Sequence, residues 1–234
     1  MIEVKAIYKN KTCEIAVEEG TYIKDIYKLT KDETDEDYIA AFVNGNLKEM
    51  TKRVKKSSAV EFIPIYSIIG FDFYKRSLLL LMLKAARDVL GKLEGDYRIN
   101  VMYSLGSGFF CQLEDTTVKI SEELLKKIKK RMDELVALDL PIIKKICNTS
   151  DMRVSFGARD LPGKAKLLKY RQSSRINIYD LEGYEDYYYG YMAHSTGCLK
   201  QYDLLEYDDG FILLIPTKQG KMLGKYEAPE KLYH

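Results

Sequence analysis

The first third of the chain alternates between apolar and polar side chains in short runs, with turn residues between the runs. Alternation with a period of two is typical of strands, and apolar residues three or four positions apart are typical of a helix. The predicted elements are a hairpin over residues 2–8 and 12–17, a helix capped by Gly20-Thr21 and ending near Thr30, and strands over 38–43 and 60–65. Together they predict a small β-grasp (ubiquitin-like) sheet crossed by one helix.

After Tyr66 the pattern restarts with a long helix over about residues 73–93, which is apolar on most sides and is therefore expected between packed layers. Strand-like segments are predicted over 97–104, 109–113, 140–147, 175–179 and 202–216. Ser121 caps a further helix with a buried stripe of Leu124, Ile128, Met132 and Leu135. We therefore predict an α+β protein with two domains, over residues 1–66 and 67–234.

The polar face of the helix after Ser121 is basic and carries Lys126, Lys127, Lys129, Lys130 and Arg131. A solvated helix face is the simpler interpretation, and a contact with a phosphate backbone is the alternative. The formal net charge is only +2, from 37 basic and 35 acidic residues. No general attraction to nucleic acid or to an anionic membrane is therefore expected.

Composition excludes several further classes of protein. Hydrophobic residues make up 46% and charged residues 31% of the chain, which fits an ordered globular protein. The beginning of the chain shows no signal region, and no apolar run could span a bilayer, so we expect a cytoplasmic protein without membrane contact. The four cysteines are widely scattered and only two histidines occur, so neither a zinc site nor a histidine-based triad is predicted.

One glycine-containing segment, Gly157 to Ala165, has the general character of a phosphate-binding loop. Five residues rather than four separate its glycines, and Ala165 stands where a hydroxyl would reach magnesium. No phosphotransferase site is therefore predicted in this chain.

Two segments of the first predicted domain resemble a known family. Gly20 to Ile26 and Ala40 to Leu47 are similar to the two recurrent segments of TGS domains. The resemblance covers nearly all of residues 1–66 and implies a β-grasp fold.

A tyrosine-rich segment in the second predicted domain resembles the editing domain of threonyl-tRNA synthetase. Asp186, Gly190 and the Ser195-Thr196-Gly197 triplet match one motif of that family in register. The resemblance then places Tyr188 at the cysteine of the family's site and Met192 at one of its histidines.

The long helix resembles the other half of the same editing site, where the family carries a pair of histidines four residues apart. Ser77, Leu81 and Ala85 set the register, which places Arg76 and Leu80 at the two histidine positions. All three imidazoles and the thiol are thus replaced, so the resemblance implies neither the family's ester hydrolysis nor zinc binding.

The closer resemblance is to uridine-kinase-like proteins of anaerobic bacteria, which carry these two domains ahead of a P-loop kinase domain. The segments that carry it are 76–78, 104–108, 139–142, 166–171, 186–197 and 210–216. His234 falls where that family continues toward its kinase domain. ATP and magnesium are therefore implied only for a kinase domain absent from this chain, and no cofactor is expected within it.

Three hypotheses of function follow. The leading one is a non-catalytic ligand-binding, regulatory or assembly module of a uridine-kinase-like protein, with the kinase domain in cis or in trans. The alternative is a freestanding threonyl-tRNA-synthetase-like editing or tRNA-binding factor. Editing would need a general base, for which Arg76 is unsuitable and Asp186 is the one weak candidate. A simple RNA-binding module rests on the TGS resemblance and the basic helix, and the near-neutral charge argues against it.

We also predict that the former editing cleft persists as a pocket, because the retained Asp186, Gly190 and Ser195-Thr196-Gly197 triplet should preserve the course of the backbone. The alternative is that bulky side chains have filled it. An arginine beside tyrosine rings suits a planar anion such as a nucleotide or nucleoside derivative. The predicted lining is Arg76, Leu80, Tyr188 and Met192, with Asp186 and Arg171 nearby.

Overall fold

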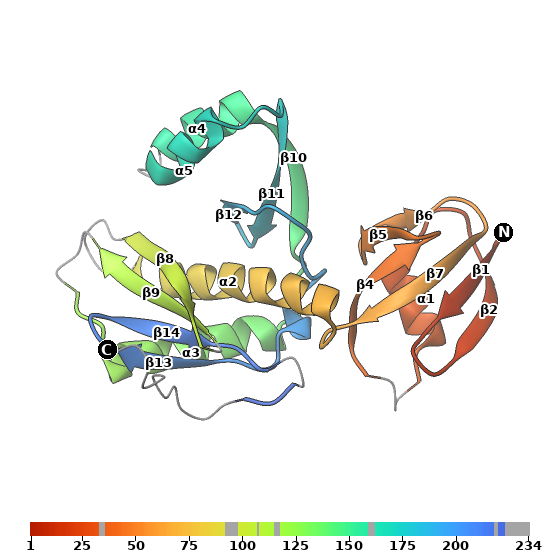
Figure 1. The fold of residues 1–234 in the computed structure, drawn as a ribbon, viewed down its shortest axis with the longest axis horizontal. Coiled ribbons are helices and arrows are strands. Elements are labelled where there is room, and N and C mark those ends of the chain that lie inside the picture. Colours follow the sequence, from red (N-terminus) through yellow and green to blue (C-terminus); the bar gives the residue numbers. More distant parts are fainter. Residues whose placement is uncertain are drawn as a thin grey trace, which may run out of the picture.

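The protein is described by a computed structural model that covers residues 1–32, 36–91, 98–106, 108–114, 118–158, 162–217 and 220–222 (Figure 1). Helices and strands are mixed along the chain, which confirms the predicted α+β class. Ser107, Arg159 to Leu161 and the end of the chain with His234 lie outside the described residues.

The first part of the chain forms a five-stranded sheet in the order β2-β1-β7-β4-β5. Its strands are β1 (Ile2–Ile7), β2 (Thr12–Val17), β4 (Tyr38–Val43), β5 (Asn46–Glu49) and β7 (Ser58–Pro64). The first and last of these strands, β1 and β7, are parallel neighbours, whereas the other pairs are antiparallel. This central parallel pair is the β-grasp arrangement that the hydrophobic pattern predicts.

The predicted cap of helix α1 (Ile23–Thr30) is wrong in detail. Thr21 lies in the short strand β3 (Thr21–Tyr22), which pairs with β6 (Arg53–Val54), and its hydroxyl donates to the Glu18 carbonyl at 2.7 Å. Tyr22 holds the capping position without a side-chain hydrogen bond. Thr21 cannot cap the helix because its backbone and hydroxyl already have other partners.

The two faces of the first sheet bury apolar residues in different cores. The face toward α1 carries Ala41 and Phe62, which pack with Ile26 of that helix. The opposite face carries Ile39 and Ile63, which belong to the large core around α2 (Ile68–Leu90). The sheet is therefore held between α1 and the second part of the chain.

Helix α2 begins five residues before the predicted start, because the Ser67 side chain accepts a hydrogen bond from the Gly70 amide at 3.1 Å. It packs against α3 (Glu122–Ala137), which Ser121 caps as predicted. The predicted stripe of α3 is buried throughout: Leu124, Ile128, Met132 and Leu135. Beside these helices lies a four-stranded antiparallel sheet made of β13 (Asp203–Tyr207), β14 (Gly210–Leu214), β9 (Gly108–Glu114) and β8 (Arg98–Leu105).

A three-stranded sheet forms a further lobe, drawn above α2 in Figure 1. Its strands are β10 (Ile143–Asn148), β11 (Arg175–Leu181) and β12 (Tyr184–Tyr187), and the connection from β10 to β11 contains helices α4 (Thr149–Ala158) and α5 (Pro162–Lys169). Phe156 and Leu168 of these helices share a small core with Ile178 of the sheet. After β12 the chain returns to α2 and α3 through a short 3-10 turn, η1 (Thr196–Cys198). No helix in the described part combines the length and apolar character that a membrane span requires.

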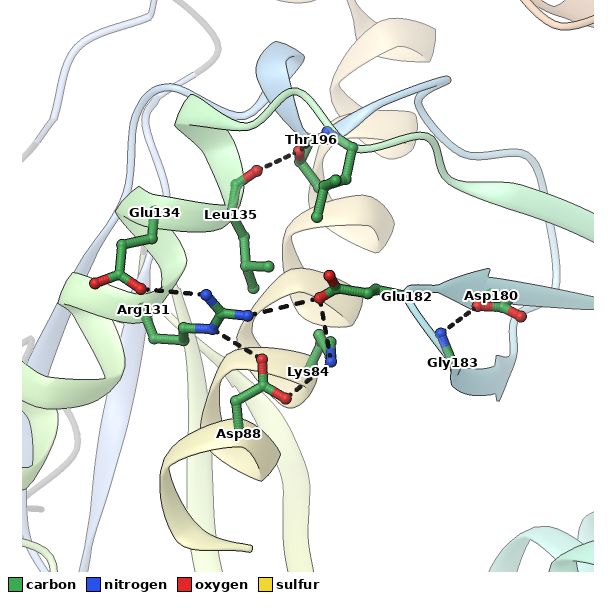
Figure 2. A network of polar contacts seen from close by, with 10 residues as sticks. Lys84, Asp88, Arg131, Glu134, Leu135, Asp180, Glu182, Gly183 and Thr196 are labelled. Carbon is green, nitrogen blue, oxygen red and sulfur yellow. Dashed lines mark hydrogen bonds and ion pairs between the residues drawn. The ribbon is translucent and has the colours of Figure 1, made fainter. Parts of the chain in front are cut away.

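An ion-pair network fixes the β11–β12 hairpin to the two long helices (Figure 2). Asp88 of α2 accepts from Lys84 Nζ at 2.8 Å and from Arg131 Nε of α3 at 2.9 Å. Glu182, in the hairpin turn, lies 3.4 Å from the Lys84 ammonium and 3.6 Å from the Arg131 guanidinium. The lobe that carries β12 is therefore held to the central helix by charge as well as by packing.

Candidate functional site

A pocket of about 410 Å³ opens between the first turns of α2, strand β11 and the segment that follows β12. Its cationic lining consists of Arg76, Arg171 and Arg175, and its aromatic lining comes from the tyrosines of the 187–191 segment. Leu47 of β5 contributes from the first sheet. The pocket is thus built by both parts of the chain and presents guanidinium groups beside aromatic rings.

Arg76 is held in place by three neighbours. Its Nε donates to the Tyr191 carbonyl at 2.9 Å, and its guanidinium carbon lies 5.6 Å from the centroid of the Phe73 ring. Gly190 has a φ of +125°, and a Cβ at this position would lie 2.9 Å from the guanidinium carbon. Burial lowers the pKa of Arg76, yet a guanidinium remains protonated in proteins. Arg76 is therefore an oriented cation on the pocket wall.

Glu49, at the end of β5, connects the first sheet to the residues beside the pocket through hydrogen bonds and an ion pair. Its carboxylate accepts from the Tyr179 hydroxyl at 2.6 Å and from the Met192 amide at 3.2 Å, and it pairs with Lys144 at 3.1 Å. Burial and the neighbouring Glu49 charge raise the pKa of Tyr179, so this hydroxyl stays a donor. The segment that carries Gly190 is consequently held from the first part of the chain.

The mouth of the pocket is formed by exposed groups. Tyr189 is 77% exposed, and the Arg171 guanidinium carbon lies 5.0 Å from the centroid of its ring. The same guanidinium lies 5.8 Å from the Tyr187 ring. A cation and the exposed ring of Tyr189 are thus available to a ligand from solvent, whereas Tyr187 is half-buried against the small core of the lobe.

The structure brings together only some of the predicted site residues. Arg76, Tyr188 and Arg171 line the pocket. Leu80 and Met192 are 0% and 1% exposed and belong to the large apolar core. Asp186 is buried, and its Oδ1 accepts from the Tyr187 amide at 2.6 Å. Leu80 lies one helical turn beyond Arg76, where α2 is already covered by other elements.

The Tyr188 hydroxyl is shielded from solvent and has no hydrogen-bond partner among the described residues. Burial and the nearby Asp186 charge raise the pKa of Tyr188 well above its usual range. Tyr188 therefore remains neutral and cannot act as the thiol at this motif position does in the family that the segment resembles.

The lining offers no general base. Within the described part of the chain, no aspartate, glutamate, histidine or cysteine side chain lines this pocket. His194 lies instead in a separate pocket of about 180 Å³, where its Nδ1 is 3.6 Å from the Cys198 sulfur and burial lowers its pKa. Over the same described ranges, no group of three or more histidine, cysteine, aspartate or glutamate side chains could hold a metal ion. The pocket is suited to binding an anion.

Two other predicted features are clear in the structure. Three lysines of the basic helix pair with acidic residues on the same helix: Lys126 with Glu122 at 2.7 Å, Lys127 with Glu123 at 2.7 Å and Lys129 with Asp133 at 3.6 Å. Gly157 lies within helix α4, whereas a phosphate-binding loop follows a strand. The first observation agrees with a solvated helix face, and the second places Gly157 in a helix, while Arg159 to Leu161 of the same segment lie outside the described residues.

Sequence reasoning missed Glu49, Tyr179 and Arg175. The Asn44-Gly45 pair, with φ values of 47° and 75°, forms the tight hairpin turn that starts β5 and so places Glu49. That pair was a usable signal for β5. The partnership of Glu49 with Tyr179 had no signal in the sequence, because 130 positions separate the two residues.

Comparison with known proteins gives a consistent set of relatives. No protein-family model matches the chain. Threonine–tRNA ligase of Thermotoga maritima is 25% identical over 167 residues, 71% of this chain and 26% of that protein. The enzyme of the same name from Aquifex aeolicus is 25% identical over 200 residues, 84% and 30% respectively, and that of Rubrobacter xylanophilus is 26% identical over 191 residues, 82% and 29%.

The chain therefore spans less than a third of the length of these relatives. Their similarity supports the resemblance to the TGS and editing-type domains of threonine–tRNA ligases. One solved structure, "Crystal structure of ATBAG1 in complex with HSP70", matches 72% of this chain and 96% of its own at 10% identity. Its TM-score of 0.27 is too low to carry an argument.

Proposed function

We propose that this chain is a tRNA-binding module that receives the 3′ end of an RNA in the pocket around Arg76 without hydrolysing an ester. One observation carries the proposal. Arg76 and Tyr188, which stand at two positions of the editing site in the family resemblance, line an open pocket together with Arg171. The similarity to threonine–tRNA ligases over most of the chain supports tRNA as the ligand class.

The chemistry of the lining suits a terminal nucleotide. The volume of about 410 Å³ lies within the range of roughly 300–1,000 Å³ that is usual for small-ligand sites. Guanidinium groups bind phosphate through paired donors, and exposed tyrosine rings stack on bases of any identity. Arg76 supplies a half-buried, oriented cation, and the Arg171–Tyr189 pair supplies the stacking surface.

The same lining supports binding without turnover. Deacylation requires a group that activates or positions a water beside the ester. The side chains around the pocket are arginines, tyrosines, asparagine and apolar residues, and Asp186 is buried behind them. The module would thus retain a recognition surface after the loss of the hydrolytic groups.

A second candidate uses the same pocket for a free nucleotide, as in a sensing module of a uridine-kinase-like protein. The arginine-rich lining favours it, since a mononucleotide presents the same phosphate and base as an RNA end. In that case phosphoryl transfer would belong to another domain or chain.

Binding measurements separate these possibilities. Fluorescence anisotropy with threonine tRNA, the same tRNA shortened at its 3′ end, and UMP compares the three ligands at one salt concentration. Loss of a stacked base weakens binding by about 1–3 kcal/mol, or roughly 5- to 150-fold. We expect this loss for the shortened tRNA and for Tyr189→Ala and Arg171→Ala.

Tyr170→Ala is the matched control, because Tyr170 is 71% exposed beside Arg171 and does not line the pocket. Equal affinity for intact and shortened tRNA, or an equal loss in the control, would refute the proposed function. Binding of UMP at the affinity of intact tRNA, with the same response to Tyr189→Ala, would establish the second candidate instead.

A further inference from the structure

A second concave surface, the β5–β6 groove, lies on the first sheet and has a volume of about 390 Å³. It is formed by β5, β6 and the turn before β7. Its polar lining is Asn44, Asn46, Lys48, Arg53, Lys55, Lys56 and Ser58. Four of these seven side chains are cationic, and no acidic side chain of the described residues lines the groove.

The positive charges of the groove, unlike those of Lys126 and Lys127 on α3, are not balanced by ion pairs with acidic side chains of the described residues. None of the four, Lys48, Arg53, Lys55 and Lys56, forms an ion pair within the described ranges. On α3, by contrast, Lys126 and Lys127 each pair with a glutamate one turn away at 2.7 Å. The low net charge of the chain therefore conceals a local cluster of positive charge on this sheet.

The groove is preformed. Arg53 donates to the Gly20 carbonyl at 2.9 Å and to the Tyr22 hydroxyl at 2.6 Å, and its guanidinium carbon lies 4.0 Å from the centroid of the Tyr22 ring. The Asn44 side chain accepts from the Ala59 amide at 2.9 Å and donates to the Ser58 hydroxyl at 3.1 Å. Arg53 and Asn44 are therefore already oriented before a ligand binds, which lowers the ordering cost at these two positions.

Strand β5 separates the groove from the pocket around Arg76. Successive side chains of a strand point to opposite faces. Leu47 lines the pocket, whereas its neighbours Asn46 and Lys48 line the groove. The two surfaces are distinct and share one edge strand.

We propose that the β5–β6 groove binds the phosphodiester backbone of RNA. The identification of that RNA as tRNA rests on the proposed function. Lysines outside protein ion pairs release counterions when they neutralise phosphates, so they contribute affinity without reading sequence. The side-chain amides of Asn44 and Asn46 each donate one N–H within the protein, to the Ser58 hydroxyl and to the Asn44 carbonyl, and each has a second N–H of the kind that contacts phosphate and sugar oxygens.

The groove fits RNA better than an anionic membrane. Surface binding to a bilayer combines cations with apolar side chains that insert between the lipids. The exposed large hydrophobic residues of the described chain include none on strands β4 to β7. A set of charged and amide groups without such residues is the chemistry of a nucleic-acid contact.

The test compares two double variants with the same change in charge. Lys55→Ala/Lys56→Ala removes two groove cations, and Lys126→Ala/Lys127→Ala removes two paired cations of α3. The affinity for threonine tRNA is measured by anisotropy over a series of salt concentrations. For each phosphate that a variant no longer neutralises, the slope of log affinity against log salt should fall by about 0.7–0.9.

We expect a smaller slope in the groove variant and an unchanged slope in the α3 variant. An unchanged slope in the groove variant, or an equal reduction of the slope in both variants, overturns the proposed RNA contact at the groove. It does not affect the proposed binding at the pocket. If the groove variant has a smaller slope but Tyr189→Ala and Arg171→Ala leave the affinity for tRNA unchanged, the result supports RNA binding at the groove and refutes RNA binding at the pocket.

Two further ligands test whether the groove binds a free phosphate ion or an anionic membrane instead of RNA. Inorganic phosphate is added at the same concentration of phosphate groups as the tRNA supplies. If it displaces the tRNA, the groove is a site for a single phosphate, and the proposed contact with the RNA backbone is overturned. Vesicles of phosphatidylserine and phosphatidylcholine test the membrane, and vesicle binding without RNA binding would also overturn the proposal. Absence of tRNA binding at every salt concentration overturns both the groove and the proposed function.

Discussion

At the scale of single residues, the pocket depends on a few positions where geometry leaves little choice. Gly190 combines a positive φ with a close approach to the Arg76 guanidinium. The backbone at 190 also presents its carbonyl 3.0 Å from the Tyr179 hydroxyl. A side chain at this position would disturb the backbone and the oriented cation together.

We therefore expect Gly190→Ala to lower the free energy of unfolding by about 1–3 kcal/mol, since a non-glycine residue in the left-handed region is strained. Gly157→Ala is the control, because Gly157 is helical and a Cβ there meets nothing within 4 Å. Alanine should be neutral or stabilising in the control. Urea denaturation measures both, and equal stability of the two variants would contradict the role of Gly190.

The thiol of Cys198 gives a prediction about pH. Burial, with the charges of Asp139 and Asp37, raises its pKa from an ordinary value of 9.0 to about 11. A raised acid pKa means that the folded state holds the proton more tightly, so the associated stability is complete below pH 9 and is lost as pH rises toward 11.

Alkylation by iodoacetamide, followed by mass spectrometry of the peptide with Cys198, should show a midpoint near pH 11 in the folded protein. In urea the midpoint should return to about 9, the ordinary value for a thiol. Labelling of the folded protein at about pH 8 as fast as in urea would show that the thiol is not buried as described.

At the scale of elements, the lobe that carries the tyrosine-rich segment is attached to α2 and α3 by the network in Figure 2. Asp88 is its centre, since it accepts from both Lys84 and Arg131. The Lys84 side chain is only 11% exposed, so its charge depends on these partners. Thr196 adds a neutral link, because its hydroxyl donates to the Leu135 carbonyl at 2.6 Å and accepts from the Leu140 amide at 2.8 Å.

We expect Asp88→Asn to lower the free energy of unfolding by about 1–3 kcal/mol, because two partly buried cations lose their shared carboxylate. Glu122→Gln removes a carboxylate from a solvent-exposed pair and should leave stability nearly unchanged. Thermal denaturation of the two variants provides the comparison. Equal effects would mean that the network contributes no more than a surface pair.

At the scale of the whole molecule, the first sheet and the second part share one apolar core, through Ile39 and Ile63 on the sheet and Phe73 on α2. The division into domains over 1–66 and 67–234 therefore stays a prediction. Glu49 reinforces this contact by bonding across it to Tyr179 and Met192. The pocket is thus lined by both parts of the chain.

For the whole chain we expect no hydrolysis of seryl-tRNA bearing the threonine anticodon above the spontaneous rate, and no stoichiometric zinc. Arg76, Leu80, Tyr188 and Met192 stand at the four positions that the family resemblance assigns to the hydrolytic site, and none of these side chains is a general base at neutral pH. A deacylation assay and elemental analysis test the two parts. Turnover that disappears in Asp186→Asn would overturn the prediction and identify the base.

The sequence by itself determined the elements and their buried faces. The stripe of α3 from Leu124 to Leu135, the β1–β2 hairpin and the apolar character of α2 all follow from periodicity. Periodicity succeeds here because burial of a side chain within an element depends on neighbours one turn or one strand position away. The resemblance of the long helix also pointed to Arg76, and that of the 186–197 segment to Tyr188, and both line the pocket together with Arg171, which was expected nearby.

Only the tertiary structure decided which of the six predicted residues meet at one surface. Leu80 and Met192 are buried in the apolar core because other elements cover those positions, whereas Arg76, one turn before Leu80 on the same helix, reaches the pocket. Glu49 reaches Met192 across 143 positions of sequence, and Lys126 forms an ion pair whereas Lys55 forms none with the described residues. Such contacts depend on how whole elements pack, which the spacing of residues along one element does not encode.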